Sequence, residues 1–182
     1  DSMIERAKAD KKTIVLPEGH DDRILAAAEE ALKQGIANLV ILGDAEEINA
    51  KGYNLEGAKI INPATSKKVE EFASLLYELR KKKGMTEEEA HELVTKDNIY
   101  FATMMVKTGQ CDGLVGGASC ATVKILSPAL KVLKTAPGAP MVSSLFLMEV
   151  PNCDLGENGV FAFADCALEI QPTAEKLAHI AN

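Results

Sequence analysis

Short apolar runs alternate with amphipathic segments over the first third of the chain. Three runs have the length and composition of buried strands, and each ends at a proline, a glycine or an Asn-Pro pair: residues 13–16, 38–42 and 59–61. Between them, apolar residues spaced three and four apart predict a helix that Asp21 or Asp22 caps and that ends at Gly35, and a shorter helix from Asp44 through Ile48. This alternation is typical of a doubly wound α/β fold with a mostly parallel sheet flanked by helices.

Helices are predicted for the next part of the chain. The apolar stripe of residues 69–79 indicates a long helix that starts at Ser66, and residues 80–83 after it are four consecutive cations. A Thr-x-x-Glu capping box at residues 86–89 predicts the start of another helix. Residues 99–107 are nearly all apolar, which predicts a helix that is buried on most sides.

The stretch from Cys111 to Gly138 predicts a binding site. It begins with a short apolar strand (113–115) and a glycine turn at Gly116 and Gly117, and continues through small residues into a helix. In open α/β sheets, ligands bind outside the carboxyl end of a strand, where backbone N–H groups and the positive end of the next helix converge. A phosphorylated or acyl ligand is the first hypothesis, while the two glycines alone are equally typical of a tight connection.

A Pro- and Gly-rich segment, residues 136–140, predicts a domain boundary. It separates a first α/β domain, residues 1–137, from the beginning of a second, incomplete α/β domain, residues 138–182. The second part is predicted to hold a hairpin and a helix, at residues 141–150, 160–164 and from 172 onward. Two strands and one helix have no further layer with which to bury the sheet, so the sequence is expected to be a piece of a longer chain or a shortened homologue.

Composition and charge narrow the classes of function. Hydrophobic residues make up 47% of the chain, as in a globular protein, and the net charge of −7 argues against binding to nucleic acid, which needs a basic surface. No apolar run approaches the roughly 18 residues of a membrane span, so a cytoplasmic protein without a membrane partner is expected. The four cysteines, at positions 111, 120, 153 and 166, lack paired C-x-x-C spacing, so reduced thiols and no metal site are predicted.

Blocks within the 111–138 stretch resemble a known family. The chain has Gly-Ala at 117–118, Pro-Ala-Leu at 128–130 and Lys-Thr-Ala at 134–136, and these fit the phosphate acetyltransferase signature, roughly G-A-x-H-S-T-x-D-T-x-R-P-A-L…K-T-A. Further stretches match in the family's order and at about its spacing: residues 14–18, 77–81, 100–105 and 163–165. The resemblance implies an isocitrate/isopropylmalate dehydrogenase-like α/β fold and reversible acyl transfer between acetyl phosphate and coenzyme A, giving acetyl-CoA and phosphate.

The resemblance also implies site residues and partners. Coenzyme A is expected as a substrate, with no permanently bound cofactor, and Arg80 matches a family arginine implicated in holding it. Cys153 matches a cysteine that some members carry beside the active site. The family's catalytic residues fall beyond Asn182, so the chain alone is expected to be inactive, and a homodimer is expected. The implied substrate-binding positions are Gly116, Gly117, Ala118, Ser119, Cys120, Thr122, Lys124 and Ser127.

Five positions inside the signature depart from the family pattern. Cys120 replaces a histidine, Ala121 a serine, Lys124 an aspartate, Ile125 a threonine and Ser127 an arginine. Ser127 precedes Pro128, and a Ser-Pro pair is typical of the N-cap and first position of a helix, so Ser127 is predicted to cap the helix. If the helix extends back to Lys124, its ammonium offers a partial replacement for the missing arginine.

Alternatives stay open. Nothing in the sequence identifies the acyl pocket, so a phosphate butyryltransferase or another short-chain acyl phosphate transferase also fits. The five departures suit an inactive homologue that acts as a binding or oligomerisation module. An NAD-dependent decarboxylating dehydrogenase is disfavoured, because no G-x-G-x-x-G follows residue 16 or 42. Arg80 also fits a cation at a helix end, and His20 and His91 also fit solvated side chains.

Overall fold

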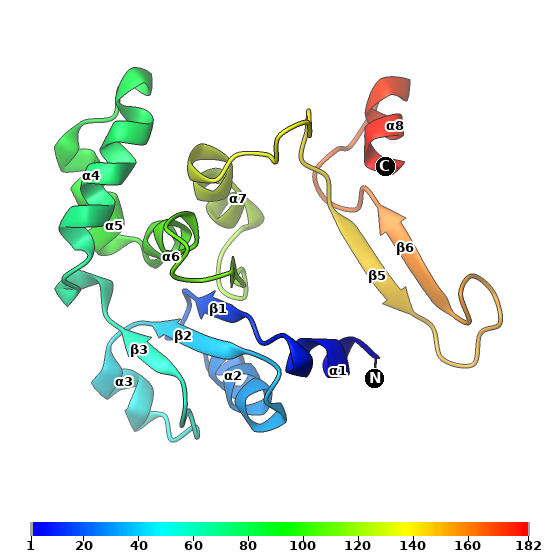
Figure 1. Cartoon of the computed structure of the whole chain (residues 1–182), viewed down its shortest axis with the longest axis horizontal. Helices are drawn as coiled ribbons and strands as arrows, with labels where there is room; N and C mark the ends of the chain where they lie inside the picture. Colours follow the sequence, from blue (N-terminus) through cyan, green and yellow to red (C-terminus); the bar gives the residue numbers. More distant parts are fainter. Residues whose placement is uncertain (1, 182) are drawn as a thin grey trace. The chain divides into compact units, whose positions relative to one another are not determined.

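The computed structural model describes residues 2–181, which divide into two compact units (Figure 1). Unit 1 extends through Lys134, and unit 2 begins at Thr135. Unit 1 holds a parallel sheet with its helices, whereas unit 2 holds an antiparallel hairpin and a helix.

The sheet of unit 1 consists of parallel strands: β1 (Thr13–Leu16), β2 (Asn38–Leu42), β3 (Lys59–Ile61) and β4 (Gly113–Leu114). Their order across the sheet is β3-β2-β1-β4. Val15 lies opposite both Val40 and Leu114. The predicted parallel α/β sheet is confirmed. β4 is one residue shorter than predicted, although Val115 still donates its N–H to the carbonyl of Val15 at 3.1 Å.

The helices of unit 1 are α1 (Ser2–Ala9), α2 (Asp22–Gln34), α3 (Ala45–Ala50), α4 (Val69–Arg80), α5 (Glu87–Lys96), α6 (Asn98–Lys107) and α7 (Thr122–Val132), with 3₁₀ turns η1 (Pro63–Thr65) and η2 (Lys81–Lys83). Three of them, namely α2, α3 and α5, begin where the capping residues predict. Asp21 caps α2, Asp44 caps α3, and Thr86 forms a capping box with Glu89 at the start of α5. These local predictions are confirmed.

The predicted start of α4 at Ser66 is wrong. The chain first makes the η1 turn, and the Ser66 hydroxyl then accepts the N–H of Lys68 at 3.2 Å ahead of the helix. A serine that binds nearby backbone in this way favours a turn over a helix, so α4 begins only at Val69.

Each side of the sheet has its own core, because alternate strand residues point to opposite sides. On one side Val15 packs with helices α4, α5, α6 and α7, and the rings of Phe72 and Phe101 meet edge to face with centroids 5.0 Å apart. On the other side α2 and α3 pack through Leu25 and Ile48. Helices therefore cover both faces of the sheet, as predicted.

Unit 2 contains the predicted hairpin. β5 (Leu145–Glu149) pairs antiparallel with β6 (Val160–Ala164), and α8 (Ala174–Ala181) follows. β5 is shorter than the predicted strand of residues 141–150, and all five of its side chains are exposed. Among the helices within residues 2–181, none has the length and apolar character needed to cross a bilayer.

Candidate functional site

The strand order of unit 1 reverses direction between β1 and β4, which creates a topological switch point. The chain leaves β1 toward α2, on one side of the sheet, and leaves β4 toward α7, on the other. Open α/β sheets bind ligands in the crevice at such a point. We define the switch-point site as residues 18–23 after β1 together with residues 116–124 after β4.

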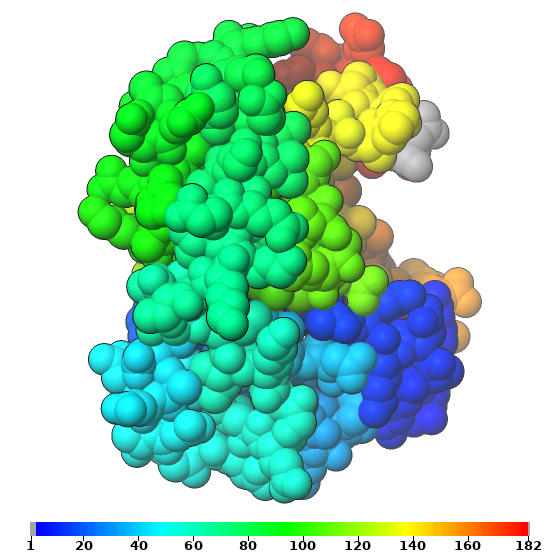
Figure 2. All heavy atoms as spheres, turned by 60° about the vertical axis from the view of Figure 1, so that its left-hand side comes forward, coloured from blue at the N-terminus to red at the C-terminus, as the bar shows by residue number. Residues whose placement is uncertain are grey.

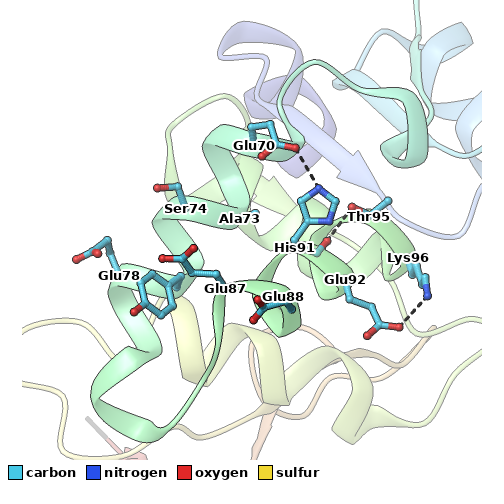
Figure 3. Close-up of a pocket in the computed structure, with 11 residues that line it drawn as sticks. Glu70, Ala73, Ser74, Glu78, Glu87, Glu88, His91, Glu92, Thr95 and Lys96 are labelled. Carbon is cyan, nitrogen blue, oxygen red and sulfur yellow. Dashed lines mark hydrogen bonds and ion pairs between the residues drawn. The ribbon is translucent and has the colours of Figure 1, made fainter.

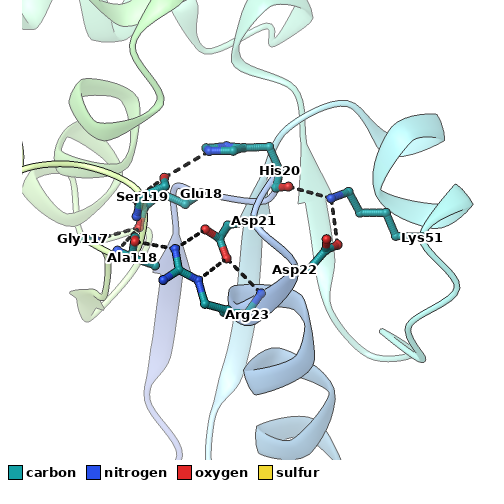
Figure 4. Close-up of polar contacts among 9 residues, drawn as sticks. All are labelled: Glu18, His20, Asp21, Asp22, Arg23, Lys51, Gly117, Ala118 and Ser119. Atoms are coloured by element: carbon teal, nitrogen blue, oxygen red, sulfur yellow. Dashed lines mark hydrogen bonds and ion pairs between the residues drawn. The ribbon is translucent and has the colours of Figure 1, made fainter.

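Glu18 joins the two halves of the switch-point site. It directly follows Pro17 at the end of β1 and is only 3% exposed. One carboxylate oxygen accepts the N–H groups of Gly117 and Ala118 at 2.7 and 3.0 Å, and the other accepts the N–H and hydroxyl of Ser119 at 2.8 and 2.7 Å (Figure 4). Three successive backbone N–H groups thus form an anion-binding nest, and a side chain of the protein itself fills it.

Gly117 makes the nest possible. Its φ of 107° lies in a region that L side chains rarely adopt. Burial raises the pKa of Glu18, but the hydrogen bonds from Ser119, Ala118 and Gly117 outweigh that effect and lower the pKa to about 2. Glu18 is therefore an ionised carboxylate at neutral pH.

Further polar contacts tie the same two connections together (Figure 4). Arg23 holds Asp21 through two N–H groups, at 3.0 and 2.7 Å, and donates to the carbonyl of Ala118 at 2.5 Å. The hydrogen bond from Arg23 lowers the pKa of Asp21 to about 2, so this pair is charged at neutral pH. His20, an exposed residue, places its Nε2 3.1 Å from the hydroxyl of Ser119.

A cavity of about 290 Å³ lies beside His20, at the carboxyl ends of β1, β2 and β3. Its polar groups are largely paired with one another. Lys51 donates to the carbonyl of His20 at 2.6 Å and to Asp22 at 2.9 Å, and Asn62 donates to Asp44 at 3.3 Å. This pairing leaves the cavity without an obvious anchor for an anionic substrate.

The prediction that Ser127 caps α7 is wrong. The helix begins at Thr122, with Ala121 as its N-cap residue, and Pro128 lies inside it. Pro128 and Val132, one turn apart, are both buried, and their packing outweighs the local Ser-Pro signal. Ser127 is half-buried in the middle of the helix.

The remaining predicted positions differ in what they offer a ligand. Thr122 and Lys124 are exposed on the first turn of α7, so α7 does extend back to Lys124. Gly116 lies against Pro17, since a Cβ on this glycine would come within 3.0 Å of the proline ring. Burial raises the pKa of the Cys120 thiol and the nearby Glu18 adds to this effect, while Lys124 opposes it. Cys120 is therefore a neutral thiol rather than a nucleophilic thiolate.

Arg80 is not brought into the switch-point site by any hydrogen bond or ion pair described for residues 2–181. It is the half-buried last residue of α4, and η2 follows it. Figure 1 shows α4 rising from the β3 side with its C-terminal end away from the sheet, and Figure 2 shows the same separation between β3 and the α4–α5 turn. A ligand that reaches both places must be long.

Cys153 belongs to unit 2. It lies half-buried in the connection between β5 and β6, next to Gly159. In the same unit Asp165 accepts the N–H of Leu168 at 2.9 Å and the hydroxyl of Ser144 at 2.5 Å, and these bonds hold its pKa well below the usual range. This carboxylate stabilises the turn after β6.

A hollow of about 710 Å³ lies between α4 and α5 in unit 1 (Figure 3). Its lining includes five glutamates, at positions 70, 78, 87, 88 and 92, against one lysine, Lys96. His91 in this lining binds Glu70 at 3.1 Å. An acidic hollow repels phosphate groups, so size alone does not make it a site for an anionic substrate.

Sequence reasoning missed Glu18 and Arg23 as members of the site. A carboxylate that directly follows a buried strand and Pro17 is the one signal that pointed to Glu18. Its partners lie 99 to 101 residues away in the sequence, so their contact depends on strand order. No group of three or more metal-ligating side chains occurs within residues 2–181.

Comparison with known proteins gives consistent results. The family described as "Phosphate acetyl/butaryl transferase" matches residues 1–182. Phosphate acetyltransferases of Thermoanaerobacterium thermosaccharolyticum and Acetivibrio thermocellus are 58% and 51% identical to the chain, over 99% and 100% of it and 55% of each relative. A crystal structure of a phosphotransacetylase from Streptococcus pyogenes superposes with a TM-score of 0.89 at 36% identity, over 99% of this chain and 54% of that one. The chain thus spans about half the length of these relatives.

Proposed function

This chain belongs to the phosphate acetyl/butaryl transferase family, and we propose that the protein transfers an acetyl group between acetyl phosphate and coenzyme A. The products are acetyl-CoA and inorganic phosphate, and the reaction is reversible. The observation that carries the proposal is similarity over nearly the whole chain to enzymes named phosphate acetyltransferase, at 58% and 51% identity.

The proposed reaction needs no redox step. The thiolate of coenzyme A attacks the carbonyl carbon of acetyl phosphate, a C–S bond forms, and the C–O bond to phosphate breaks. Phosphate leaves with the electron pair of that bond, and the thiol proton passes to a base. A protein that serves this reaction has to hold two anionic substrates, favour the thiolate and stabilise the oxyanion.

We place the acyl phosphate at the switch-point site. The hydroxyl of Thr122 and the ammonium of Lys124 are exposed on the first turn of α7, next to Ser119 and Cys120. The positive end of the helix favours a phosphate there. Because Glu18 already engages the N–H groups of residues 117–119, the anion contacts fall to these side chains rather than to the nest.

Activity is tested with purified protein, in the form in which cells make it, supplied with acetyl phosphate and coenzyme A. We expect thioester and phosphate to appear in equal amounts. Butyryl phosphate in a parallel assay separates acetyl from butyryl transfer, both of which the family's description includes. A folded protein that binds coenzyme A in calorimetry without forming thioester overturns the proposal in favour of a binding module.

Arg80 is proposed to hold a phosphate of coenzyme A rather than the acyl phosphate. Coenzyme A is long enough to reach from the switch-point site toward the end of α4, and a guanidinium is the favoured partner of a phosphate. Arg80→Ala is expected to raise the KM for coenzyme A about tenfold while the KM for acetyl phosphate stays nearly constant. Lys82→Ala, which removes a neighbouring exposed cation, is the matched control, and equal effects of both variants would assign only a general charge effect to this turn.

We also propose a cytoplasmic homodimer. The four cysteines are free, which fits a reducing compartment. The exposed apolar strand β5 supports association with a second copy. Cell fractionation tests the location, and sedimentation of the native protein at several concentrations tests the assembly.

A further inference from the structure

The nest at the switch-point site holds a carboxylate instead of leaving its N–H groups free for a ligand. Glu18 accepts three backbone N–H groups and one hydroxyl, all from residues 117–119. These are donors of the kind that a substrate phosphate seeks. The site must therefore treat Glu18 either as a fixed part of its wall or as a placeholder that the substrate displaces.

The proton positions around Ser119 favour a fixed wall. An ionised carboxylate only accepts hydrogen bonds, so the single hydroxyl proton of Ser119 points to Glu18 across 2.7 Å. Because the proton of the Ser119 hydroxyl points to Glu18, the Ser119 oxygen can only accept from His20. The donor is the Nε2–H of His20, at 3.1 Å. Glu18 thus sets the direction of the Ser119 hydroxyl, and through it the orientation of the exposed His20 ring.

The cost of displacement points the same way. Moving a phosphate into the nest would leave the buried carboxylate of Glu18 without its four donors, next to a second anion. Arg23, the cation bound to the carbonyl of Ala118, already pairs with Asp21. Lys124, the exposed cation on the first turn of α7, would then have to serve both the phosphate and the released carboxylate.

We propose that Glu18 is a positioning residue for the acyl phosphate: it fixes the backbone of residues 117–119 and the hydroxyl of Ser119, so that His20 and the first turn of α7 meet the substrate in one geometry. This inference rests on the proposed function for the choice of substrate. The geometry of the nest itself does not depend on it.

The test compares Glu18→Gln and Ser119→Ala with a matched control, Glu29→Gln. Glu29 also accepts a long-range backbone N–H, from Asn54 at 2.7 Å, but it lies on α2 outside the switch-point site. We expect the KM for acetyl phosphate to rise about tenfold in Glu18→Gln and about threefold in Ser119→Ala, with the KM for coenzyme A within twofold of the parent value. The control should leave both values unchanged.

The direction in which the KM for acetyl phosphate changes decides whether Glu18 is a positioning residue, a displaceable placeholder or a purely structural residue. A fall in the KM for acetyl phosphate on Glu18→Gln would show that Glu18 is a displaceable placeholder and would overturn the inference. Unchanged kinetic constants with lowered stability would assign Glu18 a purely structural role and would also overturn it. If Glu18→Gln does not fold, the milder Ser119→Ala decides by the same criteria.

Hydrogen exchange separates this inference from the proposed function. The amides of Gly117, Ala118 and Ser119 should be protected in the parent protein and exchange at least tenfold faster in Glu18→Gln, whether or not the protein has activity. Inorganic phosphate is the probe in calorimetry, and its binding should weaken in the same variant. If the protein shows no acetyl transfer but both of these changes occur, the proposed substrate is wrong and the positioning role of Glu18 stands. If the protection of the three amides is unchanged in Glu18→Gln, the positioning role is wrong.

Discussion

Strands β2 and β5 are both rich in large apolar residues, yet β2 is buried and β5 is exposed. In β2, Ile41 and Leu42 are 0% exposed, whereas in β5 Phe146 and Leu147 are 55% and 53% exposed. Composition does not separate them. β2 lies inside a parallel sheet with helices on both faces, whereas within residues 2–181 β5 pairs with β6 alone. An apolar strand is buried by the layers packed against it, and the described residues of unit 2 place no such layer over β5.

The aromatic pairs of the two units repeat the difference. Phe72 and Phe101 come from different helices, α4 and α6, and their edge-to-face contact joins elements within a buried core. Phe161 and Phe163 come from one strand, β6, and stack with centroids 6.1 Å apart. Contact between helices stabilises tertiary structure, while contact along one strand leaves the rings beside solvent.

The largest expected effect is on the core of unit 1. Phe72→Ala should lower the free energy of unfolding by about 3–5 kcal/mol, because it leaves a cavity among fully buried side chains. Phe163→Ala, at a position that is 55% exposed, should change it by less than about 0.5 kcal/mol. Urea denaturation of both variants measures the contrast, and equal losses would mean that β6 is as well covered in solution as the core of unit 1.

Glu18→Gln should give the next largest effect. Its pKa is about 2 in the folded protein against an ordinary value of 4.5, so the carboxylate stabilises the folded state by about 3 kcal/mol at neutral pH. The stabilisation is fully present above pH 4.5 and is lost as the pH falls through 2. The parent and the variant should therefore unfold with a large difference at pH 7 and converge in acid. Asp165→Asn, at the turn of unit 2, should leave the unfolding of unit 1 unaltered, and a comparable loss there would weaken the contrast between the units.

Local signals predicted the first half of the fold because they act over a few residues. Pro17 and Gly43 mark strand ends, and Asp44 and Thr86 cap helices through bonds to backbone two or three residues away. The role of Glu18 could not be predicted in this way, since the order β2-β1-β4 is what brings residue 18 to residues 117–119.

The start of α7 shows the converse case. The Ser-Pro pair at 127–128 favours a helix start locally, but the helix begins at Thr122 because tertiary packing of Pro128 outweighs that preference. A pattern of neighbouring residues carries no information about such packing. For the same reason the sequence predicted the glycine turn at residues 116–117 but not that Glu18 occupies the N–H groups of residues 117–119.

Helix caps allow a finer comparison of the units. Thr86→Ala removes the side-chain half of a capping box on α5, the hydroxyl that accepts the N–H of Glu89 at 3.1 Å, and should cost about 1 kcal/mol because α5 is packed against α4. Thr173 makes the corresponding contact at the start of α8, where its hydroxyl accepts the N–H of Lys176 at 3.3 Å. Thr173→Ala should leave the global unfolding unchanged and speed hydrogen exchange only within α8, because α8 has no buried residue to couple it to the core. A cost of about 1 kcal/mol from both variants would place α8 in the same cooperative unit as α5.

A substitution on β5 with a small expected effect on stability tests the exposed face directly. Leu147→Lys puts a charge in the middle of β5, where the present side chain is 53% exposed, so unfolding should shift by no more than about 0.5 kcal/mol. The same charge should reduce association, since a lysine on an exposed strand opposes pairing with another edge or apolar face. Sedimentation over a range of concentrations, read beside the unfolding curve, separates the two consequences. A loss of more than about 2 kcal/mol in the free energy of unfolding would instead show that this face of β5 is buried in solution. Both strands would then be buried, and they would differ only in the elements that cover them.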